Sequence, residues 1–135
     1  MSEFPLISHV SVGTNDMARA TAFYDKVMAT LGCKQILNFG SAVAYGWDQP
    51  VFWVNLPLDE SKPASAGNGA HFAFSANSRE QVHAFWQAGL DAGATDDGAP
   101  GPRPDYGAPY YGCFLRDLDG NKIEATFWDI SMKEG

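Results

Sequence analysis

Residues 69–93 read GAHFAFSANSREQVHAFWQAGLDAG, and residues 6–32 read LISHVSVGTNDMARATAFYDKVMATLG. A shift of 62 residues aligns like residues in the same order: His9 on His71, Asn15 on Asn77, and Ala22-Phe23-Tyr24 on Ala84-Phe85-Trp86. A histidine, a polar residue and an aromatic pair that recur in one register indicate an internal repeat. The chain therefore contains two copies of one supersecondary unit.

Each copy opens with a strand and continues into a helix. The runs 6–12 and 70–74 alternate β-branched or aromatic residues with small or polar ones, which favours strands. Capping residues and a terminating glycine follow each run: Asn15 or Asp16 and Gly32 in the first copy, Ser78 with Gln81 and Gly93 in the second. These signals predict one helix in each copy.

Three further strand candidates follow each helix. They are residues 34–38, 42–47 and 51–56 in the first copy, and a short piece near 94–95, then 110–115 and 122–127, in the second. The unit is thus β-α-β-β-β, present twice, and the fold class is α+β. We expect a single domain over residues 1–135, with module one at about 5–58, a linker at about 59–68 and module two at about 69–130.

The composition is that of a globular protein. The 135 residues are 45% hydrophobic and 19% charged, and the net charge is −7. An acidic chain repels phosphate backbones, so a nucleic-acid partner is not expected. No apolar run of about 18 residues is present to span a membrane. The stretch MSEFPLISHV holds an acid and a proline where a signal peptide needs a basic start, so we expect a cytoplasmic protein.

Cys33 and Cys113 are the only cysteines. Two distant thiols cannot form a disulfide framework or a cysteine-rich zinc site. We expect two free thiols in a reducing compartment.

The repeat puts His9 and His71 at equivalent places. If the copies pack about a two-fold axis, equivalent strands meet near it and the two histidines converge. Glu124 lies in the last predicted strand and shares a face with Lys122 and Thr126. This period fits a solvent-facing acid or a carboxylate in a polar, metal-bearing lumen. In the second interpretation, His9, His71 and Glu124 form a facial triad with open positions for substrate, water or dioxygen.

The segment 98–112 is rich in glycine and proline. Eight of its 15 residues are Gly or Pro, and it also holds Arg103, Tyr106 and Tyr110. Long loops in compact domains are usually functional or mobile. We expect this loop to form a lid or rim over the metal site, where Arg103 with Tyr106 or Tyr110 meets the substrate. A cationic residue on an acidic protein favours an anionic substrate group.

Four stretches resemble motifs of the vicinal oxygen chelate superfamily, which includes glyoxalase I, extradiol dioxygenases, fosfomycin-resistance thiol transferases and bleomycin-binding proteins. They are Ile7-Ser8-His9-Val10, Ala22-Phe23-Tyr24, GAHFAF at 69–74, and FLRDLDGNKIE at 114–124. The resemblance implies two βαβββ modules that form an open, mixed-sheet, barrel-like cup around a divalent metal: Fe, Mn, Zn or Ni. It also implies His9, His71 and Glu124 as metal ligands and Glu124 as a catalytic residue. A homodimer is implied too, because the family's small members commonly pair, and some of them build each site from both chains.

One position departs from glyoxalase I, which carries a fourth ligand, a glutamate, on the last strand of module one. The matching position here is about Trp53, and tryptophan cannot ligate a metal. The nearby Asn55 is a poor ligand for softer metals. The pattern therefore resembles the extradiol dioxygenases and fosfomycin thiol transferases, which use three protein ligands. It implies a lyase, dioxygenase or thiol transferase other than glyoxalase I itself.

Two functions fit these features. The first is a metal-dependent enzyme that acts on a small, oxygen-rich molecule through bidentate chelation, with Arg103, Tyr106, Tyr110 and Trp53 as candidate substrate contacts. The alternative is a non-catalytic binding protein that sequesters a drug-like molecule, as bleomycin resistance proteins do. Its aromatic groove would comprise Trp47, Trp53, Phe52 and Tyr45. Metal analysis of protein purified without chelator separates the two hypotheses.

Overall fold

The computed structural model describes residues 4–132 and contains two successive β-α-β-β-β modules. The first comprises β1 (Val10–Gly13), α1 (Met17–Ala29), β2 (Lys34–Asn38), β3 (Ala42–Gly46) and β4 (Phe52–Asn55). The second comprises β5 (His71–Ser75), α2 (Arg79–Asp91), β6 (Thr95–Pro102), the short 3-10 helix η1 (Pro104–Tyr106), β7 (Tyr110–Arg116) and β8 (Lys122–Trp128). Residues 1–3 and 133–135 of the predicted domain lie outside the described residues.

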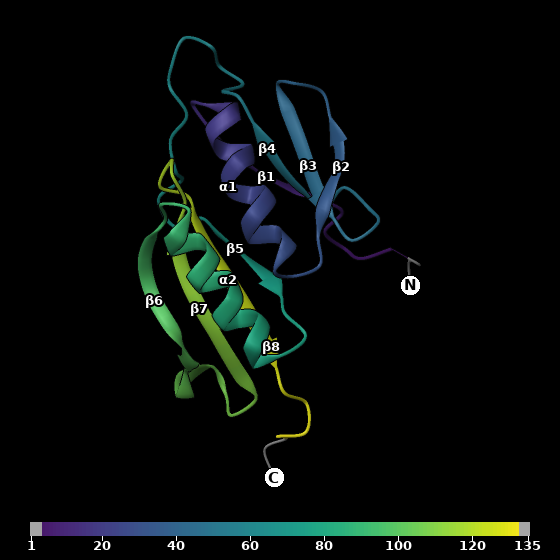
Figure 1. Ribbon diagram of the computed structural model, residues 1–135, viewed down its shortest axis with the longest axis vertical. Helices are drawn as coiled ribbons and strands as arrows, with labels where there is room; N and C mark the ends of the chain where they lie inside the picture. Colours follow the sequence, from purple (N-terminus) through teal and green to yellow (C-terminus); the bar gives the residue numbers. More distant parts are fainter. Residues whose placement is uncertain (1–3, 133–135) are drawn as a thin grey trace.

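Each module contributes one four-stranded mixed sheet. The strand orders are β1-β4-β3-β2 and β5-β8-β7-β6. The first strand of each module pairs in parallel with the last, while the other neighbours are antiparallel. The two sheets therefore repeat one topology, and they stay open instead of closing into a barrel (Figure 1). The predicted α+β class with two βαβββ modules is confirmed.

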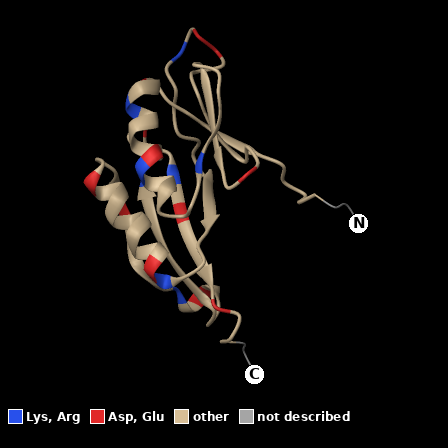
Figure 2. Cartoon of the chain, turned by 45° about the vertical axis from the view of Figure 1, so that its right-hand side comes forward, with Lys and Arg blue, Asp and Glu red and all other residues tan. Residues whose placement is uncertain are grey.

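Both helices lie on the same side of the sheets. Figure 1 shows α1 in front of the first sheet and α2 in front of the second, and Figure 2 shows the other side of the sheets without a helix. Six residues at helical spacing in α1 and just after it are buried: Ala20, Phe23, Tyr24, Val27, Met28 and Leu31. Helix α2 buries Val82, Phe85 and Gly89. Because the helices cover only one side, the opposite side of each sheet is left available for a site.

The predicted helix signals act as expected. Asp16 caps α1 by accepting a hydrogen bond from the Arg19 N–H at 3.0 Å. Ser78 caps α2 in the same way, with the Gln81 N–H 3.1 Å from its hydroxyl. Gly32 and Gly93, which end the helical segments, have φ angles of 77° and 105° that other residues rarely adopt.

Strand β1 is shorter than the predicted strand 6–12. It begins at Val10, whose N–H donates to the Val51 carbonyl at the point where the parallel partner β4 starts. The residues before Val10 have no neighbouring strand within the described chain. His9 therefore precedes the strand and is exposed.

The first part of the segment predicted as a Gly/Pro loop is a strand. Residues 95–102 form β6, which pairs with β7 through an irregular register around Gly98 and Gly101. Prolines are tolerated there because β6 is an edge strand, whose outward N–H groups need no partner. Only residues 103–109, including η1, are left to connect β6 with β7.

The turn between β7 and β8 joins the two modules. The buried Asp117 carboxylate accepts hydrogen bonds from the Tyr24 hydroxyl at 2.5 Å and from the Asn121 amide at 3.0 Å. Asn121 also donates to the Gly13 carbonyl at 2.9 Å. Tyr24 and Gly13 belong to module one, so this turn holds the two modules together.

The charged residues gather on helices and loops, and the strands carry few of them (Figure 2). No helix among residues 4–132 is long and apolar enough to cross a membrane.

Candidate metal centre

His71 and Glu124 lie next to each other on the uncovered face of the second sheet. Ile123 and Ala125, which alternate with Glu124 along β8, are fully buried in the core beneath the helices. The β5–β8 register places Ala73 beside Glu124, and the His71 ring reaches across, with Nε2 3.3 Å from Glu124 Oε1. The His71 side chain is 47% exposed and that of Glu124 only 8%. The pair thus offers a nitrogen open to solvent and a well-shielded oxygen.

These two donors suit a divalent metal. Histidine nitrogens and carboxylate oxygens bind such ions at about 2.0–2.2 Å. Two donors 3.3 Å apart can therefore share one ion. The hydroxyl of Thr126, two residues from Glu124, is buried near the Tyr110 hydroxyl. No third protein ligand joins them: in the described part of the chain, no group of three or more His, Cys, Asp or Glu could hold a metal.

Tyr110 meets the other oxygen of Glu124. Its hydroxyl donates a hydrogen bond to Oε2 at 2.6 Å, and its side chain is buried. Burial, and then the hydrogen bond and the negative charge of Glu124, raise the pKa of Tyr110 well above its ordinary value. The phenol is therefore a neutral donor across the physiological pH range.

His9 lies apart from this pair. It is exposed, its Nδ1 is 2.9 Å from the Ser8 hydroxyl, and its ring contacts Trp53 at a centroid distance of 6.5 Å. His9 and His71 nevertheless line one cleft of about 500 Å³ between the edge strands of the two modules. The structure thus brings His71 and Glu124 together but leaves His9 outside their group.

Strand register shows that Trp53 is the counterpart of Glu124. Ser11 pairs with Trp53 in the first sheet, and Ala73, its equivalent in the repeat, pairs with Glu124 in the second. Trp53 is half-buried and stacks on the exposed ring of Phe39 at 6.0 Å. Module one therefore presents an aromatic surface where module two presents a carboxylate.

Arg103 lies close to the pair but is held by its own segment. Its guanidinium donates to the carbonyls of Ala99 at 2.8 Å and Pro102 at 3.1 Å. The same group lies 5.7 Å from the ring centre of Phe114, and the Lys122 ammonium lies 4.9 Å from it. Phe114 also contacts the His71 ring. Two cations therefore surround the aromatic neighbour of His71.

The other aromatic candidates divide between surface and core. Tyr106 is 54% exposed and packs edge-to-face on Tyr110 at 4.9 Å. Trp47 is exposed, and its indole N–H donates to the Leu31 carbonyl. Tyr45 and Phe52 are buried in the core, and Phe52 also lies at the cleft that His9 and His71 line.

Sequence reasoning missed the contact between Tyr110 and Glu124 and the place of Lys122 beside Phe114. Tyr110 and Glu124 are 14 residues apart on adjacent strands, and only the strand register brings them together. The alternation along β8 does put Lys122 on the face of Glu124. This alternation was the one signal in the sequence for the place of Lys122, and the contact of Tyr110 with Glu124 had none.

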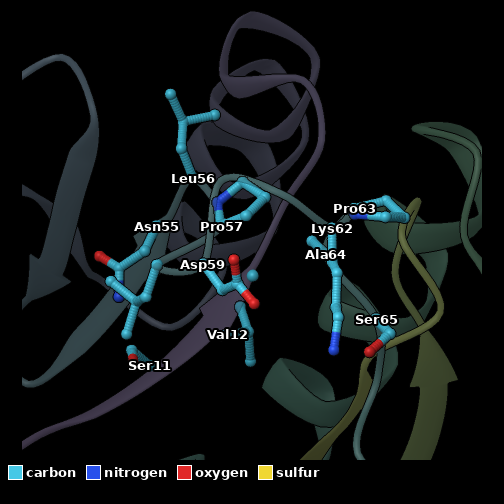
Figure 3. Close-up of a pocket in the computed structure, with 12 residues that line it drawn as sticks. Ser11, Val12, Asn55, Leu56, Pro57, Asp59, Lys62, Pro63, Ala64 and Ser65 are labelled. Atoms are coloured by element: carbon cyan, nitrogen blue, oxygen red, sulfur yellow. The ribbon is translucent and has the colours of Figure 1, made fainter.

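A second cavity lies away from this pair. It has about 320 Å³ between the β1/β4 edge and the linker, and Figure 3 shows the residues that line it. Asp59 and Lys62 are its charged residues. The Asp59 carboxylate accepts hydrogen bonds from the hydroxyl and the N–H of Ser61. These hydrogen bonds lower the pKa of Asp59.

Both cysteines are free thiols, as predicted. Cys113 is fully buried in the core, and this burial raises its pKa to about 12. Burial also raises the pKa of the half-buried Cys33. Neither thiol has the properties of an activated nucleophile.

The fold and this histidine–carboxylate pair agree with the comparison to known families. The profile of the Glyoxalase/Bleomycin resistance protein/Dioxygenase superfamily matches residues 6–125. The chain therefore belongs to this superfamily, the vicinal oxygen chelate proteins. A search of curated proteins found no significant match.

Solved structures give the same fold. A glyoxalase/bleomycin resistance protein from Albidiferax ferrireducens T118 is 37% identical, with a TM-score of 0.83 over 90% of this chain and 98% of its own. Lactoylglutathione lyase from Agrobacterium tumefaciens is 18% identical, with a TM-score of 0.64 and coverage of 98% and 100%. The fosfomycin resistance protein FosX from Mesorhizobium loti is 14% identical, with a TM-score of 0.63 and coverage of 97% of both chains. The last two are similar in fold alone.

Proposed function

We propose that this protein is a metal-dependent enzyme that acts on a small, oxygen-rich molecule, with His71 and Glu124 as metal ligands. The observation that carries the proposal is the 3.3 Å approach of His71 Nε2 to Glu124 Oε1 on the uncovered face of the second sheet. When bound, a divalent metal supplies Lewis-acid stabilisation of negative charge on a substrate chelated through two oxygens. The reaction class would be that of a lyase, a dioxygenase or a thiol transferase.

The third ligand in this proposal is His9 of a second copy of the chain. His9 is exposed and precedes an edge strand, and no third ligand joins His71 and Glu124 within residues 4–132. The uncovered face of module one carries the exposed ring of Phe39 stacked on Trp53, an apolar surface that a partner would bury. A homodimer, expected at about twice 14.6 kDa in light scattering, would supply that partner.

The remaining candidate residues would contact the substrate. Arg103 keeps N–H donors beyond the two that bind backbone carbonyls, so it can bind an anionic substrate group near Phe114. Tyr106, which is exposed beside Tyr110, would line the rim of the site, and Trp53 would face the substrate from the second copy. The two free thiols fit the predicted cytoplasmic location.

Mixing two variants that each lack a proposed metal ligand tests whether the site is shared between two copies of the chain. His9→Ala and Glu124→Ala should each lose the metal when purified without chelator. A heterodimer of the two contains one site with all three ligands, because one chain keeps His9 and the other keeps His71 and Glu124. We therefore expect co-refolded variants to regain metal, measured by elemental analysis.

His83→Ala is the matched control, because His83 bonds to Tyr111 and lies outside the group. Its metal content should equal that of the wild type. Metal retained by Glu124→Ala would contradict the proposed ligands, and no recovery in the mixture would contradict a third ligand from the second copy.

The alternative is a non-catalytic binder of aromatic molecules. The stacked pair Phe39 and Trp53, with rings inclined by only 16°, favours it as a platform for a flat ligand. Such a binder would need no metal. Quenching of tryptophan fluorescence by flat ligands in metal-free protein, lost in Trp53→Ala, would support this function.

A further inference from the structure

We propose that Tyr110 is a positioning residue that makes Glu124 bind through one oxygen: its hydroxyl holds Oε2 and leaves Oε1, beside His71, for the metal. This inference rests on the proposed function, because it takes Glu124 to be a metal ligand. It adds which oxygen of Glu124 would bind the metal and names Tyr110 as the residue that orients the carboxylate.

The two oxygens of Glu124 have different neighbours. Oε2 accepts the hydrogen bond of Tyr110 at 2.6 Å, whereas Oε1 lies 3.3 Å from His71 Nε2. A hydrogen bond to an ionised carboxylate is roughly twice as strong as one between neutral groups. Turning the carboxylate so that both oxygens face His71 would break this bond. Glu124 is therefore held with one oxygen forward.

Gly112 opens the path that lets the phenol reach Glu124. Phe114 is the β7 residue that pairs with Glu124, and Tyr110 lies four residues before it. The Tyr110 ring therefore extends forward along β7, over Gly112. A Cβ at residue 112 would collide with Tyr110 Oη and lie 2.7 Å from its Cζ. Only glycine at this position leaves room for the phenol.

Two aromatic rings hold Tyr110 in this orientation. Tyr106 and Trp128 pack on it edge-to-face, at centroid distances of 4.9 Å and 5.3 Å. Tyr110 is only 3% exposed. A ring enclosed on both sides cannot turn its hydroxyl toward solvent without displacing these neighbours.

The first test uses metal-free protein. Tyr110→Phe removes the hydroxyl and keeps the ring, and Tyr111→Phe is the matched control. The Tyr111 hydroxyl binds His83 at 2.5 Å and does not contact Glu124. NMR of carboxyl-labelled glutamate should give five side-chain signals, with that of Glu124 assigned by Glu124→Gln. We expect the Glu124 signal to shift in Tyr110→Phe and to stay in place in Tyr111→Phe. An unshifted signal would overturn the proposal.

The second test uses Co²⁺ as the metal probe. Loss of a group that orients a metal ligand typically weakens metal affinity 10–100-fold. We expect Tyr110→Phe to raise the Kd for Co²⁺ by about that factor. Its visible absorption should also change, because the released carboxylate can bind through both oxygens. Tyr111→Phe should match the wild type. Wild-type affinity and absorption in Tyr110→Phe would overturn the proposal.

A wrong proposed function would give a different result from a wrong role of Tyr110. If wild-type protein does not bind Co²⁺, the ligand role of Glu124 is wrong, while the NMR signal still reports whether Tyr110 holds the carboxylate. Gly112→Ala provides a second variant, since it keeps the phenol but blocks its path. It should reproduce both effects of Tyr110→Phe, and it decides the question if Tyr110→Phe does not fold.

Discussion

Single glycines decide which side chains can approach one another in this protein. Gly112 leaves the space through which Tyr110 reaches Glu124. Gly89 does the same in α2, where a Cβ would overlap Leu115 Cδ1. Leu115 is fully buried in β7, so Gly89 sets how closely the helix lies on the sheet. In both places the local conformation would accept alanine, and the tertiary contact excludes it.

Gly89→Ala is predicted to destabilise the protein. Alanine favours a helix by up to about 1 kcal/mol over glycine, but overpacking a core costs about 1–3 kcal/mol. The free energy of unfolding, measured with denaturant, should therefore fall. The double variant with Leu115→Ala provides the control, because the smaller side chain leaves room for the new methyl group. In that background Gly89→Ala should be neutral or stabilising, and an equal loss in both backgrounds would contradict the packing argument.

At the scale of elements, the turn 117–121 does more than reverse the chain. One oxygen of Asp117 accepts the N–H groups of Asp119 and Asn121, and the other accepts the Tyr24 hydroxyl and the Asn121 amide. Three of these hydrogen bonds therefore hold the turn itself, and the fourth, from Tyr24 in α1, attaches it to module one. The stretch 114–124, which resembles a superfamily motif, thus has a structural role at Asp117, 7 residues before Glu124 in the chain.

Asp117→Asn is predicted to cost about 2–4 kcal/mol of unfolding free energy, because an amide would place a donor against donors in a buried network. Asp119→Asn is the matched control. Asp119 accepts the Asn15 N–H, which the amide oxygen of asparagine can still accept, and lies 3.6 Å from Arg19, so its substitution should cost less than that of Asp117. Denaturant unfolding measures both. Equal losses would show that Asp117 is an ordinary turn residue.

At the scale of the whole molecule, two modules of one topology present different uncovered faces. Module one exposes Phe39 beside Trp53, and module two exposes His71 beside Glu124. The buried faces are alike, since both carry apolar residues beneath a helix.

Three tyrosine hydroxyls donate hydrogen bonds to carboxylates: Tyr24, Tyr45 and Tyr110.

Stability should fall in alkali. Burial, and then a carboxylate partner, raise the pKa of Tyr24, Tyr45 and Tyr110 above the ordinary value of 10.0. The folded state therefore keeps protons that the unfolded state loses, so their stabilisation is present below about pH 10 and declines above it. Tyr45→Phe should make this decline shallower by up to about 1.4 kcal/mol per pH unit. Denaturant unfolding across that range measures it, and an unchanged slope would contradict a raised pKa of Tyr45.

The local signals of the sequence determined both helices, most of the strands and part of the candidate site. Caps, helical spacing and terminating glycines act within a few residues, so both helices, the repeat and the fold class could be predicted. The alternation along β8 and the repeat also placed Glu124 and His71 correctly on their strands.

Tertiary structure decided what depends on neighbours. Strand β6 forms from a Gly/Pro-rich segment because β7 lies beside it, and β1 starts at Val10 because β4 offers no partner earlier. The contact of Tyr110 with Glu124 arises from strand register and the space at Gly112, which no local pattern encodes. His9 is set apart for the same reason: its place depends on which strands meet, and within one chain they do not bring it to His71 and Glu124.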